Sequence, residues 1–177
     1  EDGPALAYAQ YSGAHNMTER QGALAVLASI ECAERAQALD DFYARFGGDA
    51  LVLDKWFQTQ ALAFHPDTVG IVAALGQHPD FTLSNPNRVR SVYGAFGANQ
   101  WAFHSGDGAG YGLMSDLIIA LDPINPQTAA RMVPPLGRHR RFAEPRAGQM
   151  RAALERILSQ PGLSKDVTEQ VSKSLAG

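Results

Sequence analysis

Cysteine is almost absent from this sequence of 177 residues, since Cys32 is the only one. A chain with one cysteine cannot form an internal disulfide, and it offers no cluster of thiolates to a metal ion. Cys32 also lacks the sequence signature of an activated thiol, which makes an ordinary buried residue the expected role. Disulfide-stapled folds and cysteine-ligated metal sites are thereby excluded, and this usage is compatible with a reducing cytosol.

Long hydrophobic runs and a strong excess of charge are missing as well. The apolar stretch 117–121 is bounded by Asp116 and Asp122, so it is far too short to span a membrane. The first residues carry neither the basic nor the apolar region of a secretory signal. The 15 Lys and Arg residues against 18 Asp and Glu residues leave a net charge of -3, which gives no overall attraction to nucleic acid or anionic membranes. We therefore expect a cytoplasmic protein with no membrane and no nucleic-acid partner.

What the sequence does contain is helical periodicity. The alternation typical of strands is absent, whereas apolar residues recur at helical spacing nearly throughout. Asparagine caps, paired glycines and prolines mark the expected ends. The expected helices are Met17 to about Ile30, Ala33 to Phe46, Ala50 to about Ala63, Asp67 to Gln77, Asn87 to Phe96, Leu113 to Leu121, Pro126 to Met132, Ala147 to Leu158 and Lys165 to Leu175.

Short turns between these helices indicate antiparallel helix pairs in one all-α domain covering residues 1–177. Such pairs form either a compact bundle or a curved, superhelical solenoid of stacked pairs, similar to HEAT repeats. The aromatic residues are expected to pack between helices rather than to stack on a ligand; they are Phe42, Phe46, Trp56, Phe57 and Tyr93. The glycine-rich segment 106–112 is expected to be a flexible turn that permits close helix approach, because it fits neither the dinucleotide fingerprint nor the P-loop.

Motifs for catalysis are not found. A hydrolytic zinc site of the His-Glu-x-x-His type needs two histidines one helical turn apart. The five histidines are scattered along the sequence at positions 15, 65, 78, 104 and 139. There is no Gly-x-Ser-x-Gly nucleophile elbow either. We expect neither a catalytic residue nor a metal ligand in this chain.

Arginines give the most specific signal for binding. Arg88 and Arg90 follow Asn87 at a predicted helix start, where a cation opposes the helix dipole. Gln127 and Arg131 lie one helical turn apart, so both side chains should point the same way. Arginine suits carbonyl and carboxylate groups because its guanidinium is a planar fork of donors. A further basic stretch, 138–151, is expected to be a solvated or salt-bridged face; the alternative is nucleic-acid binding.

Several ordered motifs resemble one known family. The sequence from about Asn16 to its end is similar to the C-terminal domain of bacterial aminopeptidase N, a group of M1 zinc metallopeptidases. The motifs that carry the resemblance are Asp54-Lys55-Trp56-Phe57, Ser84-Asn85-Pro86-Asn87-Arg88-Val89-Arg90, Gly94-Ala95-Phe96, Phe103-His104, Asp107-Gly108-Ala109-Gly110-Tyr111, Asn125-Pro126-Gln127 with Arg131, and Met150-Arg151-Ala152-Ala153-Leu154-Glu155.

The resemblance implies a non-catalytic domain that closes the catalytic chamber of a zinc aminopeptidase and contributes peptide contacts. The motifs that bind zinc and the substrate amine in that family are absent, so the chain alone should be inactive. Zinc and the catalytic domain would then belong to the rest of the same polypeptide. By motif position, Arg90, Gln127 and Arg131 are expected to line the chamber, with Asn87 and Arg88 as secondary candidates.

Two other interpretations stay open at this stage. The arginines could cap neighbouring helices or form salt bridges within the superhelix instead of contacting peptide. The whole chain could be a stand-alone helical scaffold that binds another protein through a concave surface.

Overall fold

The computed structural model describes residues 2–176, which are helical with no strand among them. Most of the expected helices are confirmed within a few residues of their expected ends. The elements are α1 (Gly3–Gly13), α2 (Met17–Ala28), α3 (Ala33–Phe46), α4 (Ala50–Ala61), α5 (Thr68–Leu75), α6 (Pro86–Val89), the π-helix η1 (Arg90–Gly94), α7 (Ala95–Ala98), α8 (Gln100–Phe103), α9 (Ala109–Leu121), α10 (Pro126–Met132), α11 (Pro134–Gly137), the 3₁₀-helix η2 (His139–Arg141), α12 (Arg146–Leu158) and α13 (Lys165–Ala176).

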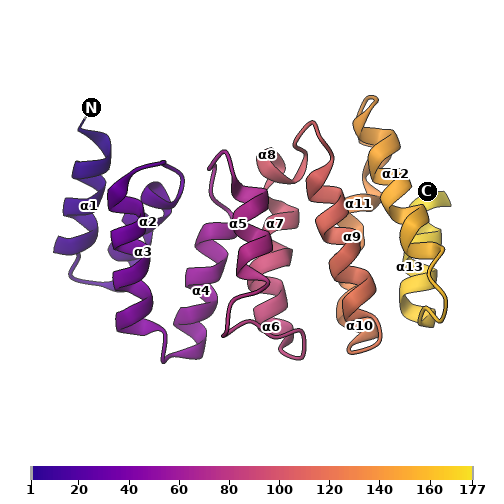
Figure 1. The fold of residues 1–177 in the computed structure, drawn as a ribbon, viewed down its shortest axis with the longest axis horizontal. Helices are drawn as coiled ribbons and strands as arrows, with labels where there is room; N and C mark the ends of the chain where they lie inside the picture. Colours follow the sequence, from indigo (N-terminus) through magenta and orange to yellow (C-terminus); the bar gives the residue numbers. More distant parts are fainter. Residues whose placement is uncertain (1, 177) are drawn as a thin grey trace.

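The helices form an elongated stack of two antiparallel rows (Figure 1). One row, here called the ascending row, runs upward in Figure 1; it comprises α2, α4, the continuous α6–η1–α7 segment, α10–α11 and α13. The descending row comprises α1, α3, α5, α9 and α12. Neighbours within a row touch, as α4 does with η1, α9 with α12, and α10 with α13. The predicted superhelical stack of antiparallel pairs is therefore confirmed.

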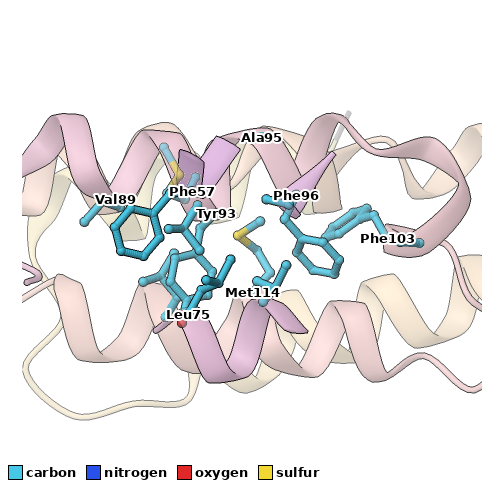
Figure 2. Close-up of a cluster of buried hydrophobic side chains, with 14 of the residues drawn as sticks. Phe57, Leu75, Val89, Tyr93, Ala95, Phe96, Phe103 and Met114 are labelled. Atoms are coloured by element: carbon cyan, nitrogen blue, oxygen red, sulfur yellow. The ribbon is translucent and has the colours of Figure 1, made fainter. Parts of the chain in front are cut away.

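The core runs along the seam between the rows. In Figure 2, Phe57 and Phe96 from the ascending row and Met114 from the descending row lie in one buried cluster. Phe96 and Phe103 pack edge to face, with ring centroids 5.5 Å apart. Trp56 donates its indole N–H to the Leu39 carbonyl at 2.9 Å, which satisfies the polar atom of a buried ring. The expected packing role of the aromatic residues is confirmed.

Side-chain caps explain where several helices begin. Asn16 accepts from the Glu19 backbone N–H at 2.9 Å, and Glu19 reaches back to accept from the His15 N–H at 3.2 Å. The two bonds form a capping box, although the returning bond goes to the residue before the cap. Asn125 caps α10 in the same way by accepting from Thr128 N–H at 3.0 Å.

The structure corrects three local expectations. The helix α1, which the sequence pattern did not predict, is held against α2 and α3 by the buried side chain of Tyr11, whose hydroxyl donates to Asp41 at 2.8 Å. The helix expected over Asn87 to Phe96 contains a π-helical turn. The helix expected from Leu113 already begins at Ala109, so the glycine-rich segment is half helical rather than a simple turn.

Candidate functional site

The first candidate residues lie where the ascending segment α6–η1–α7 begins. Asn85 caps this start by accepting from the backbone N–H of Asn87 at 3.0 Å and of Arg88 at 3.2 Å. Arg90 opens the π-helix, is exposed, and donates from Nη2 to the Asn87 side-chain oxygen. Among residues 2–176, Arg90 forms no ion pair with a carboxylate. Its guanidinium therefore keeps donors available for a ligand.

Arg88 is placed differently from Arg90. It is buried, with a relative exposure of 4%, and its guanidinium lies over the Phe57 ring at 4.8 Å. Its Nε donates to Asp54 Oδ1 at 2.6 Å and its Nη1 to the Asp80 carbonyl at 2.7 Å. Arg88 therefore ties the start of α6 to α4 and to the loop that precedes α6, which is the helix-anchoring alternative that the sequence left open.

Gln127 and Arg131 lie on α10, the next segment of the ascending row. Both are exposed, and no hydrogen bond or ion pair of either side chain exists within the described part of the chain. The two ascending segments adjoin each other, because a Cβ placed on Gly97 of α7 would lie 3.0 Å from Cγ of Pro135 in α11. In Figure 1, α6 and α10 begin at the same lower edge of the stack. The row thus presents Arg90, Gln127 and Arg131 on adjoining helices.

The histidines do not form a metal site. Within residues 2–176, no group of three or more His, Cys, Asp or Glu residues is placed to hold a metal ion. The histidines instead make local contacts: Nδ1 of His65 accepts from Asp67 N–H at 3.1 Å, and Nδ1 of His78 accepts from Asp80 N–H at 3.2 Å. The arrangement of the histidines does not fit the coordination of a zinc ion.

His104 sits in a small aromatic cluster next to the glycine-rich segment. Its Nδ1 is 2.9 Å from the Tyr111 hydroxyl, and its ring centroid is 4.1 Å from that of Phe142. Burial, and after it the positive charges of Arg146 and Arg138, hold the pKa of His104 below its usual value. His104 is therefore favoured as a neutral ring that links α8, α9 and the loop before α12.

The basic stretch after Arg131 makes several contacts inside the protein. Arg140 donates to the Ala176 carbonyl at 3.0 Å, Arg146 donates from Nε to the His104 carbonyl at 2.8 Å, and Arg151 lies 3.7 Å from Glu144. Arg138 and Arg141 are exposed. Three of the five arginines thus contact the helices and loops around them.

Two features at the ascending row could not be read from the sequence pattern. Asp54, the partner of Arg88, is 34 residues away from it in sequence. Val26 and Leu51 are apolar, yet they are exposed by 52% and 71%. An apolar side chain on a helix does not by itself show that another helix covers it.

Residues 1–176 match the model of a family described as a domain of unknown function (DUF3458_C) with ARM repeats. The chain is 43% identical over 166 residues to aminopeptidase N of Caulobacter vibrioides and 41% identical over 170 residues to that of Escherichia coli. These matches cover 93% and 94% of this chain but 19% of each relative, in their C-terminal portion. The chain thus spans about a fifth of the length of these relatives.

A solved structure agrees with this relationship. The crystal structure of Legionella pneumophila aminopeptidase A in complex with aspartic acid superposes with a TM-score of 0.93 at 37% identity. The superposition covers 98% of this chain and 20% of that one. In the described residues, no helix is long and apolar enough to cross a membrane. By sequence and by fold, the chain belongs to the DUF3458_C family of ARM-repeat domains.

Proposed function

We propose that this chain is the non-catalytic C-terminal domain of an M1 zinc aminopeptidase that removes N-terminal residues from peptides. The catalytic domain and its zinc ion belong to the remainder of the same polypeptide, and the enzyme is cytoplasmic. The helical stack closes the catalytic chamber and supplies contacts to the bound peptide. The chain by itself should be inactive, because its sequence lacks the zinc-binding motif of that family and no group of three or more His, Cys, Asp or Glu among residues 2–176 is placed to hold a metal ion.

One observation carries the proposal for peptide contact. Arg90, Gln127 and Arg131 are exposed on adjoining helices of one row, whereas the neighbouring Arg88 donates to Asp54 and to the Asp80 carbonyl. Guanidinium and amide donors on a rigid helical surface suit peptide carbonyls or the distal carboxylate of a short peptide. Asn87 acts on Arg90 rather than on the peptide, and Arg88 fixes the helix start.

The experiment that tests this contact is Arg131→Ala in the intact polypeptide, with steady-state hydrolysis of short alanyl peptides as the measurement. Losing a hydrogen bond to a charged group costs about 1.5–3 kcal/mol, which corresponds to a fall in kcat/KM of roughly ten- to a hundredfold. The matched control is Arg141→Ala, which removes an exposed arginine of η2 outside the proposed contact surface. Equal kinetics for both variants would contradict the role of Arg131.

A second measurement addresses the domain role itself. Zinc content and hydrolysis of an alanyl chromogenic substrate are compared between the intact polypeptide and a polypeptide lacking this chain. Retained zinc with lost or altered turnover is the expected result. Unchanged turnover and specificity without the chain would favour the alternative of an independent helical scaffold.

A further inference from the structure

A pocket of about 330 Å³ lies at the upper edge of the stack in Figure 1, between the start of α5, α8 and the loop that leads into α9. Its apolar wall is formed by Pro66, Val69 and Trp101, and Trp101 is half exposed. Its polar wall is formed chiefly by His104 and Arg146. A pocket of this volume suits a small organic molecule, because ligand sites in proteins usually measure about 300–1,000 Å³.

His104 offers the pocket a hydrogen-bond donor that the protein does not use. The residue is buried, with a relative exposure of 7%. The Tyr111 hydroxyl makes its only hydrogen bond within residues 2–176 to Nδ1 of this ring, at 2.9 Å. Donating there satisfies the hydroxyl proton and leaves the proton of the neutral imidazole on Nε2. Nε2 has no partner among residues 2–176, yet it is not fully enclosed, so its N–H is available to a ligand.

Arg146 is the only charged residue that lines the pocket. Its Nε donates to the His104 carbonyl at 2.8 Å, which holds the guanidinium beside the imidazole although the side chain is exposed. Its Nη1 and Nη2 groups form no hydrogen bond or ion pair within the described part of the chain. The nearby Asp107 carboxylate does not line the pocket, and it accepts from the Ser105 hydroxyl at 2.8 Å and the Ala109 N–H at 3.1 Å. The lining thus carries one positive charge.

We propose that this pocket binds a small aromatic carboxylate. The carboxylate accepts hydrogen bonds from the Arg146 guanidinium and from Nε2–H of His104, and the aromatic ring packs against Trp101. One carboxylate balances the single positive charge of the lining, whereas a phosphate monoester brings additional negative charge that the lining does not match. The pocket shares no residue with the surface that carries Arg90 and Arg131, so this inference does not depend on the proposed peptide contact.

The test is isothermal titration calorimetry of the intact polypeptide with 2-naphthoate at neutral pH. Saturable binding with a dissociation constant of about 1 mM or below is expected for a ligand of this size. The uncharged 2-naphthamide should bind at least about tenfold more weakly, because it lacks the charge that strengthens both hydrogen bonds. Absence of 2-naphthoate binding, as when a protein segment fills the pocket, would overturn the proposal. Equal or tighter binding of 2-naphthamide or of 2-naphthyl phosphate would overturn the assigned carboxylate.

Variants assign the binding to this pocket. Arg146→Gln should weaken 2-naphthoate binding at least about tenfold, and Trp101→Ala should weaken it by removing the packed ring. The matched control is Arg151→Gln, which removes an exposed arginine of the same helix outside the pocket and should leave the affinity unchanged. Circular dichroism checks that each variant is folded. Arg146→Lys keeps the charge but loses the planar fork, so it should bind with intermediate affinity. Equal affinities of the Arg146 variants and Arg151→Gln would place the ligand elsewhere and refute the site.

Discussion

At the scale of single residues, the Arg88–Asp54 pair is the most informative. Both side chains are largely withdrawn from solvent, with exposures of 5% and 18%, and their Nε–Oδ1 distance is 2.6 Å. A buried pair of this kind stabilises little relative to apolar residues, but removing one partner leaves a buried charge uncompensated. The pair thus fixes one geometry for the segment that ends in Arg90.

Asp54→Asn should lower the free energy of unfolding by about 2–4 kcal/mol, because it leaves the Arg88 guanidinium buried without its counter-charge. Urea unfolding followed by circular dichroism measures the change. The matched control is Glu169→Gln, which breaks the fully exposed Lys173–Glu169 pair and should produce no measurable change. Similar effects of both substitutions would show that Arg88 does not depend on Asp54.

His104 predicts a pH dependence of stability. Its pKa is lowered in the folded state by burial and by two arginines, so the unfolded state binds the proton more readily. Stability from this group is therefore complete above the unfolded pKa, about 6.5, and falls as the pH drops through that value toward the lower folded pKa. The expected result is a loss of stability between pH 7.5 and 5.5 that is reduced in His104→Gln and unchanged in the exposed control His15→Gln.

At the scale of elements, the sequence predicted most helices because their boundaries are encoded by neighbouring residues. Asn16 and Asn125 cap the helices that follow them, and Gly47 ends α3. The helix α1 was not predicted although Asp2 precedes it and Pro4 lies in its first turn, because Asp2 makes no capping hydrogen bond with its side chain. Packing of Tyr11 stabilises this helix. The π-helix from Arg90 was not predicted either, because an i to i+5 hydrogen-bond pattern has no local sequence signal.

Gly110 shows how close packing fixes the start of α9. A Cβ placed there would lie only 2.5 Å from the Phe103 carbonyl oxygen, whereas Gly112 on the same helix has nothing within 4 Å. Gly110→Ala should therefore destabilise the protein by about 1–3 kcal/mol. Gly112→Ala should stabilise it by about 0.5–1 kcal/mol through better helix propensity. Thermal unfolding should show a lower melting temperature for Gly110→Ala and a higher one for Gly112→Ala. A shift in the same direction for both variants would contradict the packing argument.

At the scale of the whole molecule, the ordered motifs were enough to predict the family and the superhelical stack. The motifs also predicted which residues would be candidates for peptide contact, and the structure places Arg90, Gln127 and Arg131 on the surface. The exposure of the apolar residue Val26 could not be predicted, because its neighbours Ala23 and Leu27 on the same helix are buried. Whether an apolar face is covered depends on how helices stack, and that is a long-range property.

The two rows also determine how the molecule deforms. Each helix pair contacts mainly the adjacent pairs, and no helix of the N-terminal pair packs substantially on α12 or α13 within the described residues. A stack whose two ends are not in contact can bend as a whole, since a rotation of a few degrees at each junction between helix pairs adds up along its length. The distance between the N-terminal helix pair and the surface carrying Arg131 can therefore change while every junction keeps its packing.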